Sequence, residues 1–212
     1  MNKSKIIQGL KFLSKYDKNQ PTLYGFKTYG ANRHNFILNS TISEKDARKF
    51  EKEFQIELPI DYVEFITEIG NGGAGPGNGL LPLDKWNCEL INPNKDFLKT
   101  PFPHTQKWNI NSNPYEFESQ EWIKFHNENY YTDKHVAGAI RISHYGCGIM
   151  CMLVVSGLEK GHIWVDDRCS EYGIYPAGKE PLSFEKWYMD WLEKSINAIQ
   201  PVKKWYSFFG KK

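Results

Sequence analysis

One segment constrains the fold more than any other part of this chain, because it contains residues that favour both the start and the end of a helix. It runs from Glu57 to Gly73 and reads ELPIDYVEFITEIGNGG. Pro59 suits the first helical position, where a missing N–H costs nothing and φ is already set. Gly70 and the triplet 71–73 end the helix, because Gly and Asn accept a left-handed C-cap. The helical spacing of the apolar residues predicts one buried stripe, formed by Ile60, Val63, Phe65, Ile66 and Ile69.

Length and composition bound the class of protein. A chain of 212 residues suits one domain with embellishments. A hydrophobic share of 40% and an aromatic share of 15% are enough for a real core and exclude a disordered chain. The formal net charge of +2 argues against both a basic nucleic-acid footprint and an acidic nucleic-acid mimic. We therefore expect no direct binding of nucleic acid.

Cysteine usage and hydropathy indicate the compartment. The 4 cysteines do not have the spacing of a disulfide framework in a chain of this length. No continuous apolar run near the N-terminus resembles a secretion signal, and no stretch of about 18 apolar residues could span a membrane. The sequence predicts a reduced, soluble, cytoplasmic protein that does not enter a membrane.

Further helices are expected on both sides of the 57–73 segment. The apolar spacing over 6–13 predicts an N-terminal helix that ends near Asp17–Pro21. Ser43 followed by Asp46 has the pattern of a capping box and predicts a helix over 43–54. A modest helix is expected over 118–129. Ser183 is expected to cap a final Trp-rich helix that extends to about Ile199 and is closed by Pro201.

Short β-rich runs predict a sheet in the second half of the chain. The continuously apolar run 149–155 is typical of a central strand buried on both faces. Six runs are candidates for strands: 35–38, 79–83, 137–143, 148–156, 161–167 and 171–175.

The domain organisation follows from these elements. An N-terminal helix and irregular lead-in occupy 1–42, and the main α+β domain occupies 43–199. An Asn- and Pro-rich excursion interrupts that domain at 92–118. A basic aromatic tail, 200–212, follows it. Such a tail could touch RNA or a membrane surface, although docking its rings on its own domain is the more usual arrangement.

Two separated motifs carry a family resemblance. The first is L-P-x-D-Y-x-x-F with N-G-G, over 58–73. The second is LVVSGLEKGHIWVDD at 153–167, followed by SFEKWYMDWLE at 183–193. In this order they resemble the SUKH superfamily, a fold shared by a yeast regulator of cell-wall assembly and glucan synthesis and by bacterial immunity proteins. The likeness covers about 43–86 and 137–196, so the N-terminal helix, the excursion and the tail lie outside it.

The resemblance implies a single α+β domain with a mixed or antiparallel central sheet flanked by helices. It also implies protein binding rather than catalysis, and because the family carries no shared catalytic set, no catalytic residues are transferred to this chain. We expect no cofactor and no metal. The implied function is that of an intracellular immunity protein that neutralises a cognate protein toxin, often a nuclease, of a polymorphic or contact-dependent toxin system. The alternative is a SUKH-type regulatory interaction module without a toxin partner. The oligomeric state stays open.

Two groups of residues offer catalytic or metal-binding alternatives. Asp166 and Asp167 at a strand end could act as general acid and base or bind a cation. However, no third acidic residue or histidine lies at a sequence spacing typical of such a site. Cys147 and Cys151, with His144 and His162 nearby, invite a zinc site. Their spacing lacks the usual two-residue gap, and Cys151 lies in the most apolar strand. A buried cysteine and a polar strand end are the simpler interpretations.

A partner surface is predicted on loops beside the sheet, because binding residues concentrate on loops that a rigid scaffold positions. The Asn-Gly-Gly turn exposes backbone N–H groups, and the other segments join aromatics to carboxylates. The expected contact residues are Asn71, Gly72, Gly73, Asp84, Trp86, Asp166, Asp167 and Tyr172.

Overall fold

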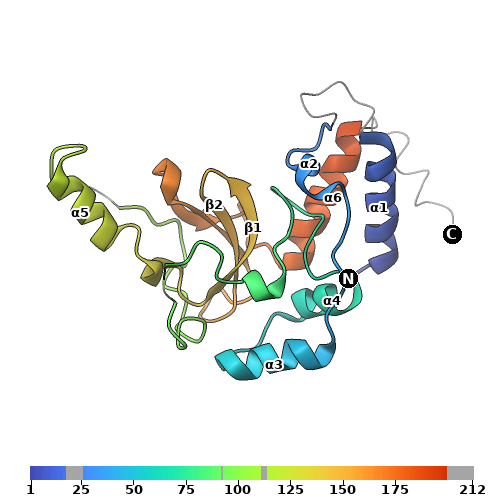
Figure 1. Ribbon diagram of the computed structural model, residues 1–212, viewed down its shortest axis with the longest axis horizontal. Coiled ribbons are helices and arrows are strands. Elements are labelled where there is room, and N and C mark those ends of the chain that lie inside the picture. Colours follow the sequence, from blue (N-terminus) through green and yellow to red (C-terminus); the bar gives the residue numbers. More distant parts are fainter. Residues whose placement is uncertain (18–25, 92, 111–113, 200–212) are drawn as a thin grey trace.

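The computed structural model describes residues 1–17, 26–91, 93–110 and 114–199. Within this part of the chain, four strands form one antiparallel sheet in the order β1-β2-β3-β4, so each strand pairs with the next along the chain. The sheet lies in the middle of the molecule, with helices on one side and an extended segment that carries one helix on the other (Figure 1). The strands are β1 (Ala139–Gly146), β2 (Ile149–Val154), β3 (Ile163–Asp167) and β4 (Gly173–Pro176).

Burial explains why β2 is a central strand. All its residues except Ile149 are buried, and it pairs with β1 on one side and β3 on the other. Cys147 and Gly148 form the tight turn between β1 and β2, both with positive φ, at 49° and 79°. Two positive-φ residues match the right-handed twist of a hairpin. The predicted central strand is confirmed, and the candidate at 171–175 becomes β4.

The helices begin largely where the caps predict. Ser43 Oγ accepts the Asp46 N–H at 3.1 Å, and the Asp46 carboxylate in turn accepts the Ser43 hydroxyl at 2.6 Å. Ser183 Oγ accepts the Lys186 N–H at 3.3 Å. Pro59 sits just before the first helical residue of its helix. The α-helices are α1 (Lys3–Tyr16), α2 (Ala31–His34), α3 (Glu44–Phe54), α4 (Ile60–Glu68), α5 (Gln120–Asn129) and α6 (Phe184–Ile199).

One hydrophobic core joins the helices to the sheet. Phe65 and Ile66 of α4 are buried, as predicted, and so is Trp187 of α6. Trp191 is only half-buried, and Ile60 at the exposed start of α4 lies outside the core with 78% of its surface exposed. The N-terminal helix belongs to the same core, because α1 packs along α6 (Figure 1). The chain is therefore a single α+β domain with an antiparallel sheet.

The excursion supplies the second layer on the sheet. Trp108 pairs with Ile174 of β4 through two backbone hydrogen bonds of 2.8 Å, and the Phe102 ring meets Trp164 of β3 edge-on, with centroids 5.0 Å apart. After α5 the chain returns through the 3₁₀ helix η3 (Asp133–Val136) into β1. The described part of the excursion thus covers the face of the sheet opposite α4 and α6.

Two predicted strands do not form. Leu38 makes one isolated bridge, to Gly73, and Leu80 makes two, to Gly73 and to Ser143 of β1. Asn35 adopts the left-handed conformation, with φ at 50°, which ends an extended run before it can pair. At the second position Pro82 has no N–H to donate, and the chain turns at once into the 3₁₀ helix η2 (Leu83–Lys85). The expected strands at 35–38 and 79–83 are corrected to these bridges.

Candidate functional site

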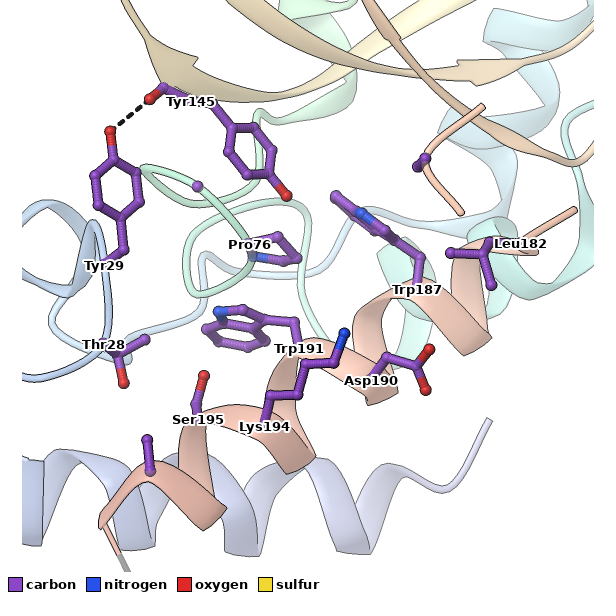
Figure 2. A pocket seen from close by; sticks show the side chains of 13 residues that line it. Thr28, Tyr29, Pro76, Tyr145, Leu182, Trp187, Asp190, Trp191, Lys194 and Ser195 are labelled. Atoms are coloured by element: carbon purple, nitrogen blue, oxygen red, sulfur yellow. Dashed lines mark hydrogen bonds between the residues drawn. The ribbon is translucent and has the colours of Figure 1, made fainter. Parts of the chain in front are cut away.

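A concave surface lined with aromatic rings lies between the sheet and α6. Two adjoining hollows of ≈ 410 and ≈ 490 Å³ make it up, and they share Tyr29, Tyr145, Ala177 and Trp187 among their lining residues. Figure 2 shows the first hollow, with Trp187 and Trp191 rising from α6 towards Pro76 and Tyr145. We name the whole surface the aromatic groove, lined by Tyr29, Tyr145, Tyr175, Trp187 and Trp191.

Helix α6 contributes one complete face to the groove. Its lining residues are spaced by three and one along the chain, a pattern that places them on one side of a helix. The opposite side carries Leu192 and Ile196, which lie close to Gly9 of α1. Helix α6 therefore seals the core with one face and presents the other to the groove. The groove face consists of Trp187, Asp190, Trp191, Lys194, Ser195 and Ala198.

The floor of the groove is the end of the sheet. Cys151, Val165 and Tyr175 occupy paired positions on β2, β3 and β4, so their side chains stand side by side on one face. Val165 and Tyr175 are half-buried, and no helix covers this end of the face in the described part of the chain. The floor is thus apolar and partly open.

Tyr29 forms the outer wall. Its hydroxyl donates to the carbonyl oxygen of Tyr145 at 2.6 Å, and 65% of the residue is exposed (Figure 2). This bond ties the lead-in before α2 to the end of β1. Burial raises the pKa of the Tyr145 hydroxyl far above its ordinary value, with the Cys151 thiol beside it adding to the shift. Tyr145 is therefore a neutral ring at physiological pH rather than an acid–base group.

Charged groups stand at the edges of the groove. The Asp167 carboxylate accepts the Tyr175 hydroxyl at 3.1 Å and lines the sheet side. On α6, Asp190 pairs with Lys186 at 3.2 Å, and Lys194 is exposed. An apolar floor with sparse charges at its margin can take up the side chains of another polypeptide.

The Asn-Gly-Gly turn is a structural junction. The Asn71 side-chain oxygen accepts the Leu83 N–H at 2.9 Å, Gly72 is buried, and Gly73 bridges Leu38 and Leu80. The backbone groups of the triplet are thus largely occupied inside the protein. Only the continuation of the loop, at Pro76 and Gly77, reaches the aromatic groove.

Asp166, one of the residues predicted to contact a partner, has its side chain buried in an ion-pair network. Arg141 donates to it at 2.9 Å, and Arg168 donates to both of its oxygens at 2.7 and 2.8 Å. Burial opposes the charged form, but these bonds and charges prevail and lower the Asp166 pKa to about 2. Asp167 is buried as well, although it lines the groove.

The two aspartates do not form a paired-carboxylate centre. Successive residues of a strand point to opposite faces, so Asp167 points towards the groove and Asp166 points to the other face, where it meets Arg141 and Arg168. The zinc interpretation is also unsupported: Cys147 is exposed in the β1–β2 turn while Cys151 is buried in β2. Within the described ranges, no three side chains of the metal-binding types form a cluster.

The remaining predicted residues lie apart from one another. Trp86 is buried against Phe54 and Phe97, so its ring is not available to a partner. Asp84 is exposed on η2 and does not line the groove. Tyr172 is 61% exposed, and Lys107 lies over both its ring and that of Tyr175.

Tyr172 shares Lys107 with Tyr175 of the groove but lines neither hollow itself. Asp167 is thus the predicted side chain that lines the groove, and Asp84, Trp86 and Asp166 lie elsewhere. Sequence reasoning missed Tyr29, Tyr145 and Tyr175. The alternation on the strands could have indicated the last of these, and the polar Asp190 and Lys194 beside the tryptophans could have shown that one face of α6 is not core.

The fold and the groove together define an α+β domain with a concave aromatic surface. The chain belongs to the SMI1 / KNR4 family (SUKH-1), whose family model matches residues 41–183. The matched region begins just before α3 and ends just before α6, so it includes the excursion and leaves α1 and α6 outside. Neither a curated protein nor a solved structure matches the chain significantly. Among the described residues, no helix has the length and hydropathy needed to cross a bilayer.

Proposed function

We propose that this protein is a cytoplasmic immunity protein that binds and neutralises a cognate protein toxin of a bacterial toxin system. Membership of the SUKH-1 family supports a role in immunity or regulation through protein binding. The observation that carries the proposal is the aromatic groove, which supplies this chain with a contact surface. Neutralisation by binding needs no cofactor, no metal and no catalytic residue.

The composition of the groove supports protein binding. Tyrosine and tryptophan dominate the energetically important positions of protein interfaces, because they bury a large area with few rotatable bonds. Here Tyr29 is 65% exposed on the wall that the two hollows share, and Trp191 is half-buried in the first hollow. The groove rests on the sheet and α6, both of which are anchored in the core. A partner would therefore meet a surface that is already formed, which lowers the entropic cost of binding.

The alternative is a regulatory interaction module that binds a protein of its own cell without neutralising a toxin. The family includes proteins described as SMI1 and KNR4, which favours this second candidate. Both candidates use the groove, so they differ in the partner and in the consequence of binding.

Co-expression with the toxin encoded beside the gene tests the proposal. We expect the full chain to restore growth to a bacterial host that expresses the toxin, and to co-elute with the toxin in size-exclusion chromatography. An unrelated toxin of the same chemistry is the control and should not be neutralised. A folded protein that neither rescues growth nor forms the complex would contradict the immunity role and leave the regulatory module as the candidate.

A further inference from the structure

Two adjacent aspartates of β3 have opposite surroundings. Asp166 is held by two arginines, whereas the Asp167 carboxylate accepts a hydroxyl from Tyr175 at 3.1 Å and a thiol from Cys169 at 3.8 Å. Asp167 is only 7% exposed, and no lysine, arginine or histidine of the described residues forms an ion pair with it. The tail predicted at 200–212 lies outside those residues. Since buried charges in proteins are generally paired, this carboxylate is suited to a cation from another molecule.

Aromatic rings surround the space in front of this carboxylate. Asp167 lines the second hollow of the aromatic groove, of ≈ 490 Å³, together with Tyr29, Tyr145, Tyr175 and Trp187. The side chains of Tyr145 and Trp187 point towards one another there (Figure 2). The faces of aromatic rings are electronegative and attract cations. A carboxylate in the wall of an aromatic hollow therefore suits an organic cation.

We propose that this hollow is a recognition site for an arginine side chain of the partner protein, whose guanidinium group pairs with Asp167 and stacks on the aromatic rings. A guanidinium group is planar and weakly hydrated, and it can donate two parallel hydrogen bonds to one carboxylate. The aliphatic stem of the arginine would lie on the apolar floor, at Val165 and Ala177. The identity of the partner rests on the proposed function, whereas the affinity of the hollow for a guanidinium group does not.

The chain's own Lys107 shows that the rings at this edge attract a cation. Its ammonium lies 5.7 Å from the centroid of the Tyr175 ring and 6.0 Å from that of Tyr172. These distances are those of cation–π contacts, which extend to about 6 Å. Lys107 does not line the hollow and forms no ion pair with Asp167 among the described residues. It therefore leaves the carboxylate open to a second cation.

A metal ion fits the hollow less well than an organic cation. A calcium ion takes about 6–8 oxygen ligands, and Asp167 is the one carboxylate that lines this hollow. Elsewhere in the described ranges, too, no three metal-binding side chains gather. Aromatic walls can stack on a guanidinium group, but they cannot replace the water ligands of a metal ion.

Nuclear magnetic resonance titration of the full-length chain tests the site without any partner. The probes are N-acetylarginine methylamide and N-acetylcitrulline methylamide, which has the same shape but an uncharged urea group. We expect the arginine probe to shift the Trp187 indole N–H and Val165 methyl signals. The citrulline probe should bind at least about tenfold more weakly, because its hydrogen bonds to the carboxylate are not charge-assisted. The Trp122 indole signal should not move, since α5 lies at the other end of the molecule (Figure 1).

The probes also define the results that contradict the site. Absent shifts, or equal affinity for the arginine and citrulline probes, would overturn the proposal. Equal affinity for N-acetyllysine methylamide would overturn the choice of a guanidinium group over an ammonium group.

A pair of variants tests the role of the charge. Asp167→Asn keeps an acceptor for the Tyr175 hydroxyl but removes the charge, so the affinity for the arginine probe should fall by at least about tenfold. Its midpoint of urea denaturation should not fall, because the lost charge has no ionic partner among the described residues. Cys169→Ala is the matched control, because it removes a neutral donor from the same carboxylate and keeps the charge. Equal losses of affinity in the two variants, or a lower midpoint for Asp167→Asn, would overturn the proposal.

The cognate toxin separates this proposal from the immunity function. If the toxin binds, Asp167→Asn should weaken its binding by at least about tenfold and Cys169→Ala should not. A toxin that binds both variants equally well would overturn the assignment of the site to the partner's arginine. A chain that binds the arginine probe but no toxin would contradict the immunity function and support the guanidinium site.

Discussion

At the scale of single residues, one carboxylate holds two arginines in the interior. Arg141, Asp166 and Arg168 are all at most 6% exposed, so the network has one more positive than negative group. Arg168 also donates to the carbonyl oxygens of Tyr130 and Thr132, at 2.6 and 3.0 Å. It thereby fastens the segment after α5 to the sheet. Asp166 is a structural residue because its partners come from β1 and from η4 (Arg168–Ser170).

Removing that carboxylate should be costly. We expect Asp166→Ala to lower the free energy of unfolding by about 3–5 kcal/mol, because it leaves two buried guanidinium groups without their counter-charge. Urea denaturation followed by circular dichroism measures the change. Asp84→Ala, at an exposed aspartate, should stay within about 0.5 kcal/mol of the unaltered protein. Equal losses in the two variants would show that the network contributes nothing beyond an exposed charge.

A second residue links stability to pH. His34 is 8% exposed, and its Nδ1 accepts the Phe36 N–H at 3.0 Å, which requires that nitrogen to be unprotonated. Burial lowers the pKa of His34 from 6.5 to about 4. Between pH 6.5 and about 4, His34 is therefore protonated in the unfolded chain and neutral in the folded chain. The stability contributed by neutral His34 is fully present above pH 6.5 and is lost as the pH falls towards 4.

We expect this loss to reach about 3 kcal/mol over that interval, at 1.36 kcal/mol per unit of pKa difference. The comparison is with His34→Asn, whose side-chain oxygen can accept the same N–H but does not titrate. Burial also lowers the pKa values of His104 and His135, and their contribution is common to both proteins. The difference between the two stability–pH curves therefore reports His34 alone. Parallel curves would contradict the prediction.

At the scale of elements, the loop after α4 shows which structural features can be predicted from the sequence. The apolar spacing and the glycines correctly predicted a helix that ends at an Asn-Gly-Gly turn. The same local pattern could not predict that Gly73 lies between Leu38 and Leu80. Both bridges depend on tertiary packing, which brings these separate segments together. The same limit applies to Asp166, whose Arg141 partner is 25 residues away in sequence.

The crowding at Gly73 gives a test with a matched control. Gly73 and Gly161 have nearly the same φ, at +94° and +92°. A Cβ on Gly73 would lie 2.5 Å from the Ile37 carbonyl oxygen, whereas one on Gly161 would meet nothing within 4 Å. We expect Gly161→Ala to cost about 1–2 kcal/mol from the backbone alone. Gly73→Ala should cost about 1–3 kcal/mol more, because the contact adds overpacking. Urea denaturation of both variants measures the difference, and equal costs would contradict the crowding.

At the scale of the whole molecule, the sequence predicted the class of fold better than the site. Alternation, caps and the apolar run at 149–155 each depend on local chemistry, and the sheet and helices follow from them. The aromatic groove depends instead on how α6 meets the sheet. Of the two tryptophans on the groove face of α6, Trp187 is buried and Trp191 is half-buried. The tilt that leaves Trp191 half-buried is a property of tertiary packing.

The last prediction asks whether the groove is the surface that contacts a partner. Tyr29→Ala removes an exposed wall of the groove and a single hydrogen bond to Tyr145, so the fold should persist. If the cognate toxin binds there, its affinity should fall by at least about tenfold, which corresponds to about 1.4 kcal/mol. Phe117→Ala is the matched control, because Phe117 is an aromatic residue of the excursion with a similar exposure, 71% against 65% for Tyr29. Titration calorimetry with both variants measures the two affinities. A loss on Phe117→Ala and none on Tyr29→Ala would move the contact surface to the excursion, since aromatic residues contribute most where a partner excludes water around them.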